Sequence, residues 1–158
     1  MSVEISEHDD NEAKKIRNAC LVMLTRREFS TKEITDKISH KFESSSTIHQ
    51  VISTLKTEGL LCDVRFTESF VRSRMNKGQG KQRIKAEIKH KGIGDELVKK
   101  VIDEQGTNWI SIAEKALLKK FGTQVSSDRK EVGKRIRFLQ YRGFDFDQIK
   151  YAISSSID

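Results

Sequence analysis

The sequence has no proline in 158 residues and only two cysteines. Because proline breaks helix interiors, its absence leaves long segments free to form helices. Cys20 and Cys62 form no CxxC motif, so the sequence predicts neither a disulfide framework nor a zinc site. No run approaches the ~18 apolar residues of a membrane helix, and the acidic residues 1–10 resemble neither a signal nor a transit peptide. We therefore expect a cytoplasmic protein without membrane contact.

Patterns of catalytic residues are also missing. The histidines have no metal-ligand spacing, and no serine, histidine and aspartate arrangement stands out. Gly78 and Gly80 follow no predicted strand and lack the further glycines or lysine of a phosphate-binding loop, so they are interpreted as a turn between helices. We expect no enzyme activity, no cofactor and no metal.

What the sequence has in abundance is helical periodicity, and the pattern repeats about every 50 residues. A shift of 50 superposes Ile34 on Ile84 and Ile38 on Ile88, and a further shift of 51 superposes Ile88 on Leu139. Within each copy the apolar residues recur at i, i+3, i+4 and i+7, the spacing of an amphipathic helix. Three copies account for nearly the whole chain.

We therefore predict an all-α fold of three tandem three-helix repeats, at residues 1–60, 61–106 and 107–158. Such units share apolar faces and stack into an elongated array, which can be curved. Capping pairs at Ser30 and Glu33 and at Asp128 and Glu131 indicate two helix starts, and Gly143 indicates a helix end. The expected helices are residues 12–28, 31–43, 46–58, 63–77, 81–91, 95–104, 109–121, 128–142 and 146–156.

The net charge of +7 is unevenly distributed along the chain. Residues 65–100 contain 11 basic and 4 acidic side chains, and residues 115–142 contain 9 basic and 2 acidic ones, so each block carries +7. The remainder, with 10 basic and 17 acidic side chains, carries −7. Clustered positive charge predicts an acidic or polyanionic partner. The alternative is a basic face that only contacts solvent.

Two groups of cations are candidate contacts for such a partner. Lys81, Lys85 and Lys89 are four residues apart and form one stripe on a helix, separate from the apolar stripe of Ile84 and Ile88. A similar basic face is predicted in the third repeat. The full candidate set is Arg72, Arg74, Lys77, Lys81, Arg83, Lys85, Lys89, Lys134, Arg135, Arg137 and Arg142.

Two segments resemble the signatures of a known family, the RecX regulators. The central one begins at residues 61–66 and continues through Phe70 and Arg74 to the glycine turn at 78–80 and the Lys-Gly-Ile sequence at 91–93. The run Arg-Phe-Leu-Gln-Tyr-Arg-Gly-Phe at 137–144 resembles the C-terminal signature, and residues 27–34 resemble a weaker N-terminal one. The sequence departs from the family pattern at Leu60 and Cys62, where Tyr and Asp are usual, and at Lys81, where Pro is frequent.

The resemblance implies a protein that binds the RecA recombinase and its nucleoprotein filament. It also implies restraint of recombinase, ATPase and SOS co-protease activity, with single- or double-stranded DNA as a further candidate partner. We expect a monomer. The alternative is a helical DNA-binding module that acts without RecA, because a three-helix unit can place a recognition helix in the major groove.

Overall fold

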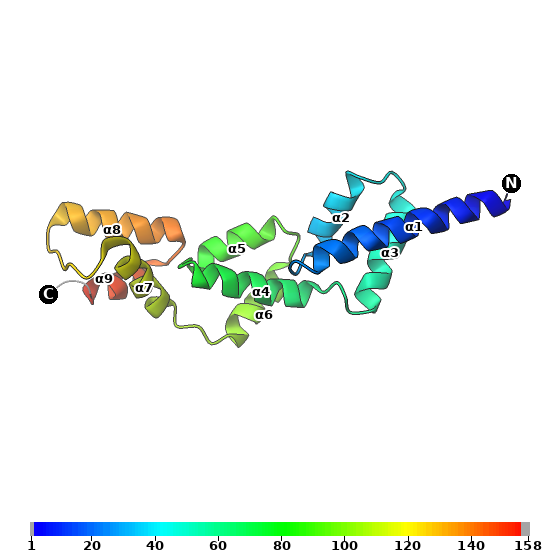
Figure 1. The fold of residues 1–158 in the computed structure, drawn as a ribbon. Coiled ribbons are helices and arrows are strands. Elements are labelled where there is room, and N and C mark those ends of the chain that lie inside the picture. Colours follow the sequence, from blue (N-terminus) through cyan, green and yellow to red (C-terminus); the bar gives the residue numbers. More distant parts are fainter. Residues whose placement is uncertain (1, 156–158) are drawn as a thin grey trace. The chain divides into compact units, whose positions relative to one another are not determined.

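The structure is a computed structural model that describes residues 2–155, with side chains from residue 7 onward. Within this part it contains nine helices and no strand, which confirms the all-α prediction (Figure 1). The bounds predicted at 95–104 and 109–121 are those observed. The helices are α1 (Ser2–Leu24), α2 (Thr31–Ser39), α3 (Ser45–Thr57), α4 (Asp63–Asn76), α5 (Lys81–Lys89), α6 (Asp95–Glu104), α7 (Trp109–Phe121), α8 (Arg129–Arg142) and α9 (Phe146–Ser154).

The first helix departs most from its predicted bounds, because it begins at Ser2 instead of residue 12 and ends at Leu24 instead of residue 28. Residues 2–11 contain no glycine or proline, and acidic residues near a helix N-terminus interact favourably with the helix dipole. The acidic segment therefore continues the helix. α2 also ends earlier than predicted, at Ser39, and Phe42 then packs against the core of the helices around it.

The predicted helix caps are partly correct. Ser30 and Glu33 form the reciprocal pair at α2, in which each side chain accepts a hydrogen bond from the other residue's backbone N–H. Asp128 caps α8 as predicted, but the structure gives Glu131 no return bond to the Asp128 backbone. A second reciprocal pair occurs instead at α9, whose N-cap is Asp145.

The chain forms two compact units, and the first consists of Met1–Thr67 together with Lys91–Ile93. In this unit α1, α2 and α3 pack on one another around fully buried side chains such as Ile16, Ile34 and Leu55. The turn after α5 belongs to this unit as well, because Lys91 Nζ lies 2.7 Å from a carboxylate oxygen of Glu33.

The second unit consists of Glu68–His90 and Gly94–Asp158. Here α5 packs on α6, and α7, α8 and α9 pack around Ala113, Leu139 and Ala152. The three residues superposed by the sequence shifts, Ile38, Ile88 and Leu139, are all fully buried, so the repeat period corresponds to equivalent core positions. The repeat boundaries at 60/61 and 106/107 stay a prediction.

Hydrogen bonds join two glycine turns of the second unit, one after α4 and one after α8. The Gly80 N–H donates to the Arg142 carbonyl at 2.7 Å, and the Gln82 N–H donates to the Gly143 carbonyl at 3.1 Å. Gly143 has a φ of 94°, and a Cβ at this position would collide with the backbone and Cβ of Arg83. Only glycine permits this close contact, which fixes the ends of α4 and α8 beside each other.

Candidate interaction surface

The predicted lysine stripe lies on α5. Lys85 and Lys89 are exposed and Lys81 is half-buried, whereas Ile84 and Ile88 are fully buried. The helix therefore presents separate basic and apolar faces, as its periodicity predicts. None of the three lysines has a carboxylate partner among the described residues.

Two predicted contact residues, Arg74 and Arg83, are engaged inside the second unit. Their Nε atoms lie 3.0 and 2.9 Å from the two carboxylate oxygens of Glu87. Arg74 also covers the ring of Phe70, and Arg83 covers the ring of Tyr141, at 4.5 and 5.1 Å from the ring centroids. Because Glu87 neutralises part of their charge, these arginines connect α4, α5 and α8 more than they present free cations.

In the third predicted repeat, Lys134 and Arg137 are exposed, but Arg135 is only 4% exposed. The Arg135 guanidinium donates to the Gln124 carbonyl at 2.7 Å. Burial therefore removes Arg135 from the surface that a partner can reach. The sequence repeat could have indicated this burial, because a shift of 51 superposes the buried Ile84 on Arg135.

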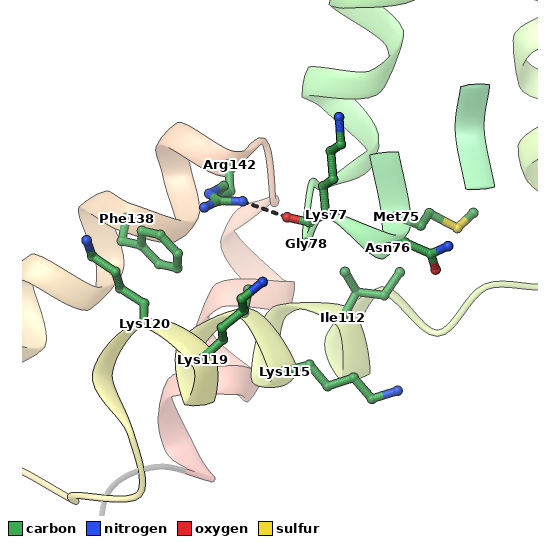
Figure 2. A pocket seen from close by; sticks show the side chains of 11 residues that line it. Met75, Asn76, Lys77, Gly78, Ile112, Lys115, Lys119, Lys120, Phe138 and Arg142 are labelled. Carbon is green, nitrogen blue, oxygen red and sulfur yellow. Dashed lines mark hydrogen bonds between the residues drawn. The ribbon is translucent and has the colours of Figure 1, made fainter. Parts of the chain in front are cut away.

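The remaining predicted residues lie near the end of α4. Arg142 Nη1 donates to the Lys77 carbonyl at 2.7 Å, and the guanidinium lies 5.0 Å from the ring centroid of Phe138 (Figure 2). The side chains of Arg72 and Lys77 are exposed and have no carboxylate partner among residues 7–155. Arg142 therefore has a structural bond, while Arg72 and Lys77 present free charge.

Beside the bond between Arg142 and Lys77 lies a hollow of about 510 Å³. It is bounded by the end of α4 and the turn after it, by one side of α7 and by the end of α8 (Figure 2). Apolar side chains such as Ile112 and Phe138 form part of its wall. Of the 11 residues that line it, none is acidic and five are cationic: Lys77, Lys115, Lys119, Lys120 and Arg142.

Sequence reasoning missed the three α7 lysines of this hollow as candidate contacts. They were counted in the basic block of residues 115–142, but they are about 40 residues away from Lys77 along the chain. Only the packing of the second unit brings them beside the end of α4. The spacing of Lys115 and Lys119, which places them on one helical face, was the one local sign.

Other reactive groups give no site. His8, Asp9 and Glu12 lie close enough to hold a metal ion, but they are on one stretch of α1 and mostly exposed, and nothing else points to an ion there. Burial raises the pKa of the Cys20 thiol to about 11, so this thiol is not a nucleophile at neutral pH. Among the described residues, no helix is both long enough and apolar enough to span a membrane.

The fold and the surface together define a class of protein. It is an all-α protein built from repeated three-helix units, and its second unit presents lysines without carboxylate partners.

Comparison with known proteins identifies the family. The model of the second three-helix domain of RecX matches residues 63–102, and that of the third three-helix domain matches residues 110–153. The chain is 35% identical over 144 residues to the regulatory protein RecX of Halorhodospira halophila, which covers 91% of this chain and 89% of that protein. It is 38% identical over 135 residues to the regulatory protein RecX of Legionella pneumophila, over 85% of this chain and 90% of that protein.

A solved structure agrees with these matches. The crystal structure of RecX from Lactobacillus salivarius superposes with a TM-score of 0.76 at 25% sequence identity, over 92% of this chain and 97% of that one. The chain belongs to the RecX family of regulatory proteins. This confirms the family predicted from the central and C-terminal segments.

Proposed function

We propose that this chain binds the RecA recombinase and its nucleoprotein filament and restrains recombinase, ATPase and SOS co-protease activity. Membership of the RecX family supports a regulatory role, and the sequence resemblance implies RecA as the target. In this proposal the chain acts in the cytoplasm as a monomer and has no catalytic site of its own.

The observation that carries the proposal is the set of free cations on the second unit. Lys81, Lys85 and Lys89 on α5 have no carboxylate partner among the described residues, and no acidic residue lines the hollow beside α7. A nucleoprotein filament presents nucleic-acid phosphates together with protein carboxylates. Both attract such cations, and phosphate contacts add the favourable release of counterions.

Binding along a filament also explains how a small protein can regulate many RecA molecules. The subunits of a filament share one nucleic-acid strand, so one bound molecule affects more than the subunit it touches. We therefore expect RecA-dependent ATP hydrolysis on single-stranded DNA to slow when this protein is added at well below one molecule per RecA. Unchanged turnover at equal stoichiometry would contradict the proposal.

The second candidate is a helical DNA-binding module that acts without RecA. The lysine-lined hollow favours it, because ammonium groups bind phosphates well. Capture of this chain on immobilised RecA in the absence of DNA distinguishes the two candidates. Retention on RecA supports the regulator, whereas retention on DNA alone supports the module.

A further inference from the structure

The lining of the hollow combines lysines without carboxylate partners and an arginine held by a hydrogen bond. Lys115, Lys119 and Lys120 are exposed side chains of α7 and have no carboxylate partner in the described part of the chain. Arg142 is half-buried, and its bond to the Lys77 carbonyl holds the guanidinium in place while leaving other N–H donors available. A ligand with several negative charges would therefore meet both a fixed donor and adaptable ammonium groups.

The directions of the lysine side chains indicate which cations can contact a ligand in the hollow. Figure 2 shows Lys119 extending from α7 toward the turn at Gly78, and Lys120 extending past the side of Phe138. Lys77 and Lys115 point away in other directions. Lys119 and Arg142 therefore point into the space beside Gly78, and Lys77, Lys115 and Lys120 extend the positive charge around it.

We infer that this hollow binds the phosphate backbone of a single-stranded nucleic acid. Lysine binds phosphate as a point charge, whereas paired recognition of a carboxylate favours an arginine fork, and the only arginine here already donates to Lys77. Ile112 and Phe138 add an apolar wall that a base or sugar can contact. A single strand offers its bases for such contact, while a duplex stacks them inside.

This inference deepens the second candidate, the DNA-binding module, and does not rest on the regulation of RecA, because the site is complete within the second unit. It also separates the hollow from the α5 stripe, because Lys81, Lys85 and Lys89 do not line the hollow. The test therefore uses the purified full chain without RecA.

The experiment measures binding of a labelled oligothymidylate by fluorescence anisotropy over a range of salt concentrations. Replacing two contacts with K119Q/K120Q should lower the slope of log affinity against log salt by about 1.4, because each phosphate contact on a single strand contributes about 0.7. Affinity at about 0.1 M salt should fall roughly 25-fold, because the slope changes by about 1.4 over the one decade between about 0.1 and 1 M salt. Far-ultraviolet circular dichroism should not change, since lysine and glutamine have similar helix propensities.

The matched control is K14Q/K15Q, which also removes two adjacent, exposed lysines of a helix without carboxylate partners in residues 7–155. We expect this variant to keep the wild-type slope. An equal loss in both variants would show that only net charge matters, and it would overturn the inference.

Two further arms identify the ligand. Inorganic triphosphate and ATP compete with the oligonucleotide in the same assay, and tight competition by either one with no effect of K119Q/K120Q on the oligonucleotide slope would overturn the single-strand assignment. Loss of RecA capture in K119Q/K120Q with unchanged oligonucleotide binding would instead assign the hollow to a protein partner. A lower salt slope for K119Q/K120Q, together with RecA-dependent ATP turnover that the wild-type protein does not slow, would support phosphate binding in the hollow and refute only the proposed regulation of RecA.

Discussion

The two compact units differ in how they use charge. The first contains 11 basic and 11 acidic residues and is neutral, while the second contains 19 basic and 12 acidic residues and carries the whole net charge of +7. In the first unit, ion pairs join residues far apart in the sequence, such as Arg17 with Glu58 at 2.7 Å and Arg65 with Glu28 at 3.0 Å. Here charge is part of the tertiary structure.

In the described part of the second unit one ion pair, Arg74 with Glu87 at 3.0 Å, joins separate helices, and two other structural arginines bond to backbone carbonyls. Arg142 donates to the Lys77 carbonyl and Arg135 to the Gln124 carbonyl, so neither needs a carboxylate from elsewhere in the unit. The lysines of α5 and α7 are left without partners in the described residues. The comparison indicates that the fold of the second unit does not use the charge of these lysines, which is therefore available for binding.

The largest expected effect is on stability, and it compares a glycine turn of the second unit with one of the first. Gly143→Ala should lower the free energy of unfolding by about 3 kcal/mol, because alanine at a positive φ costs about 1 kcal/mol and its Cβ would also collide with Arg83. Urea unfolding measures the change. Gly59 in the first unit has a φ of 75°, but no atom lies within 4 Å of the position that a Cβ would occupy. Gly59→Ala should therefore lower the free energy of unfolding by only about 1 kcal/mol. Equal costs would show that the glycine contact in the second unit is not tight.

The next effect concerns the α5 stripe. K81Q/K85Q/K89Q should weaken RecA binding about tenfold, because three surface ion pairs at ~0.5 kcal/mol each add to about 1.5 kcal/mol, and about 1.4 kcal/mol is a factor of ten. Binding of a bare oligonucleotide should hardly change, since the hollow is intact. Surface plasmon resonance on RecA and anisotropy on the oligonucleotide measure the two values.

The control for the stripe removes three exposed lysines of the neutral first unit, K14Q/K15Q/K41Q, and should leave RecA binding unchanged. A decrease of about 2 in the salt slope on single strands would instead assign the stripe to phosphates. If neither kind of binding changes while circular dichroism is preserved, the stripe only contacts solvent.

The smallest expected effect tests whether the charge of Glu33 stabilises the first unit. Burial raises the pKa of Glu33, but hydrogen bonds from Arg27, Lys91 and the Ser30 backbone outweigh it, so the folded-state pKa lies below the usual 4.5. The charged carboxylate thus stabilises the fold above pH 4.5, and this contribution is lost as the pH falls through the folded-state pKa. Glu33→Gln keeps a residue that can complete the helix cap but removes the charge.

E33Q should therefore be less stable than wild type by about 1 kcal/mol at neutral pH, and the difference should shrink toward about pH 3. Urea unfolding at the two pH values measures it. Glu43→Gln is the control, because the Glu43 side chain is exposed and makes no ion pair among the described residues. A constant difference for E33Q at both pH values would exclude a role for its charge.

Local rules predicted most of the fold. Apolar periodicity and the absence of proline located the helices, and Ser30 with Glu33 located the α2 start, because these features depend on residues within one or two turns. The start of α1 was missed because its first turns have polar residues and no apolar stripe to mark them.

The candidate surface was less predictable than the helices. A helical stripe such as Lys81, Lys85 and Lys89 follows from spacing alone, but the burial of Arg135 depends on a carbonyl 11 residues earlier. The hollow depends on packing between α4, α7 and α8, which no local pattern encodes. Comparing equivalent positions of the repeats would have indicated that Arg135 is buried. Nothing in the sequence alone indicates that Lys77 and Lys119 line the same hollow.

The most direct test of the account is RecA-dependent ATP hydrolysis on single-stranded DNA, titrated with the wild type, K81Q/K85Q/K89Q and K14Q/K15Q/K41Q. We predict that wild type and K14Q/K15Q/K41Q slow turnover equally, well below one molecule per RecA, and that K81Q/K85Q/K89Q requires about tenfold more protein for the same effect. Turnover that stays unchanged at equal stoichiometry with the wild type, or that responds identically to all three proteins, would contradict a RecA regulator that binds through the charge of its second unit.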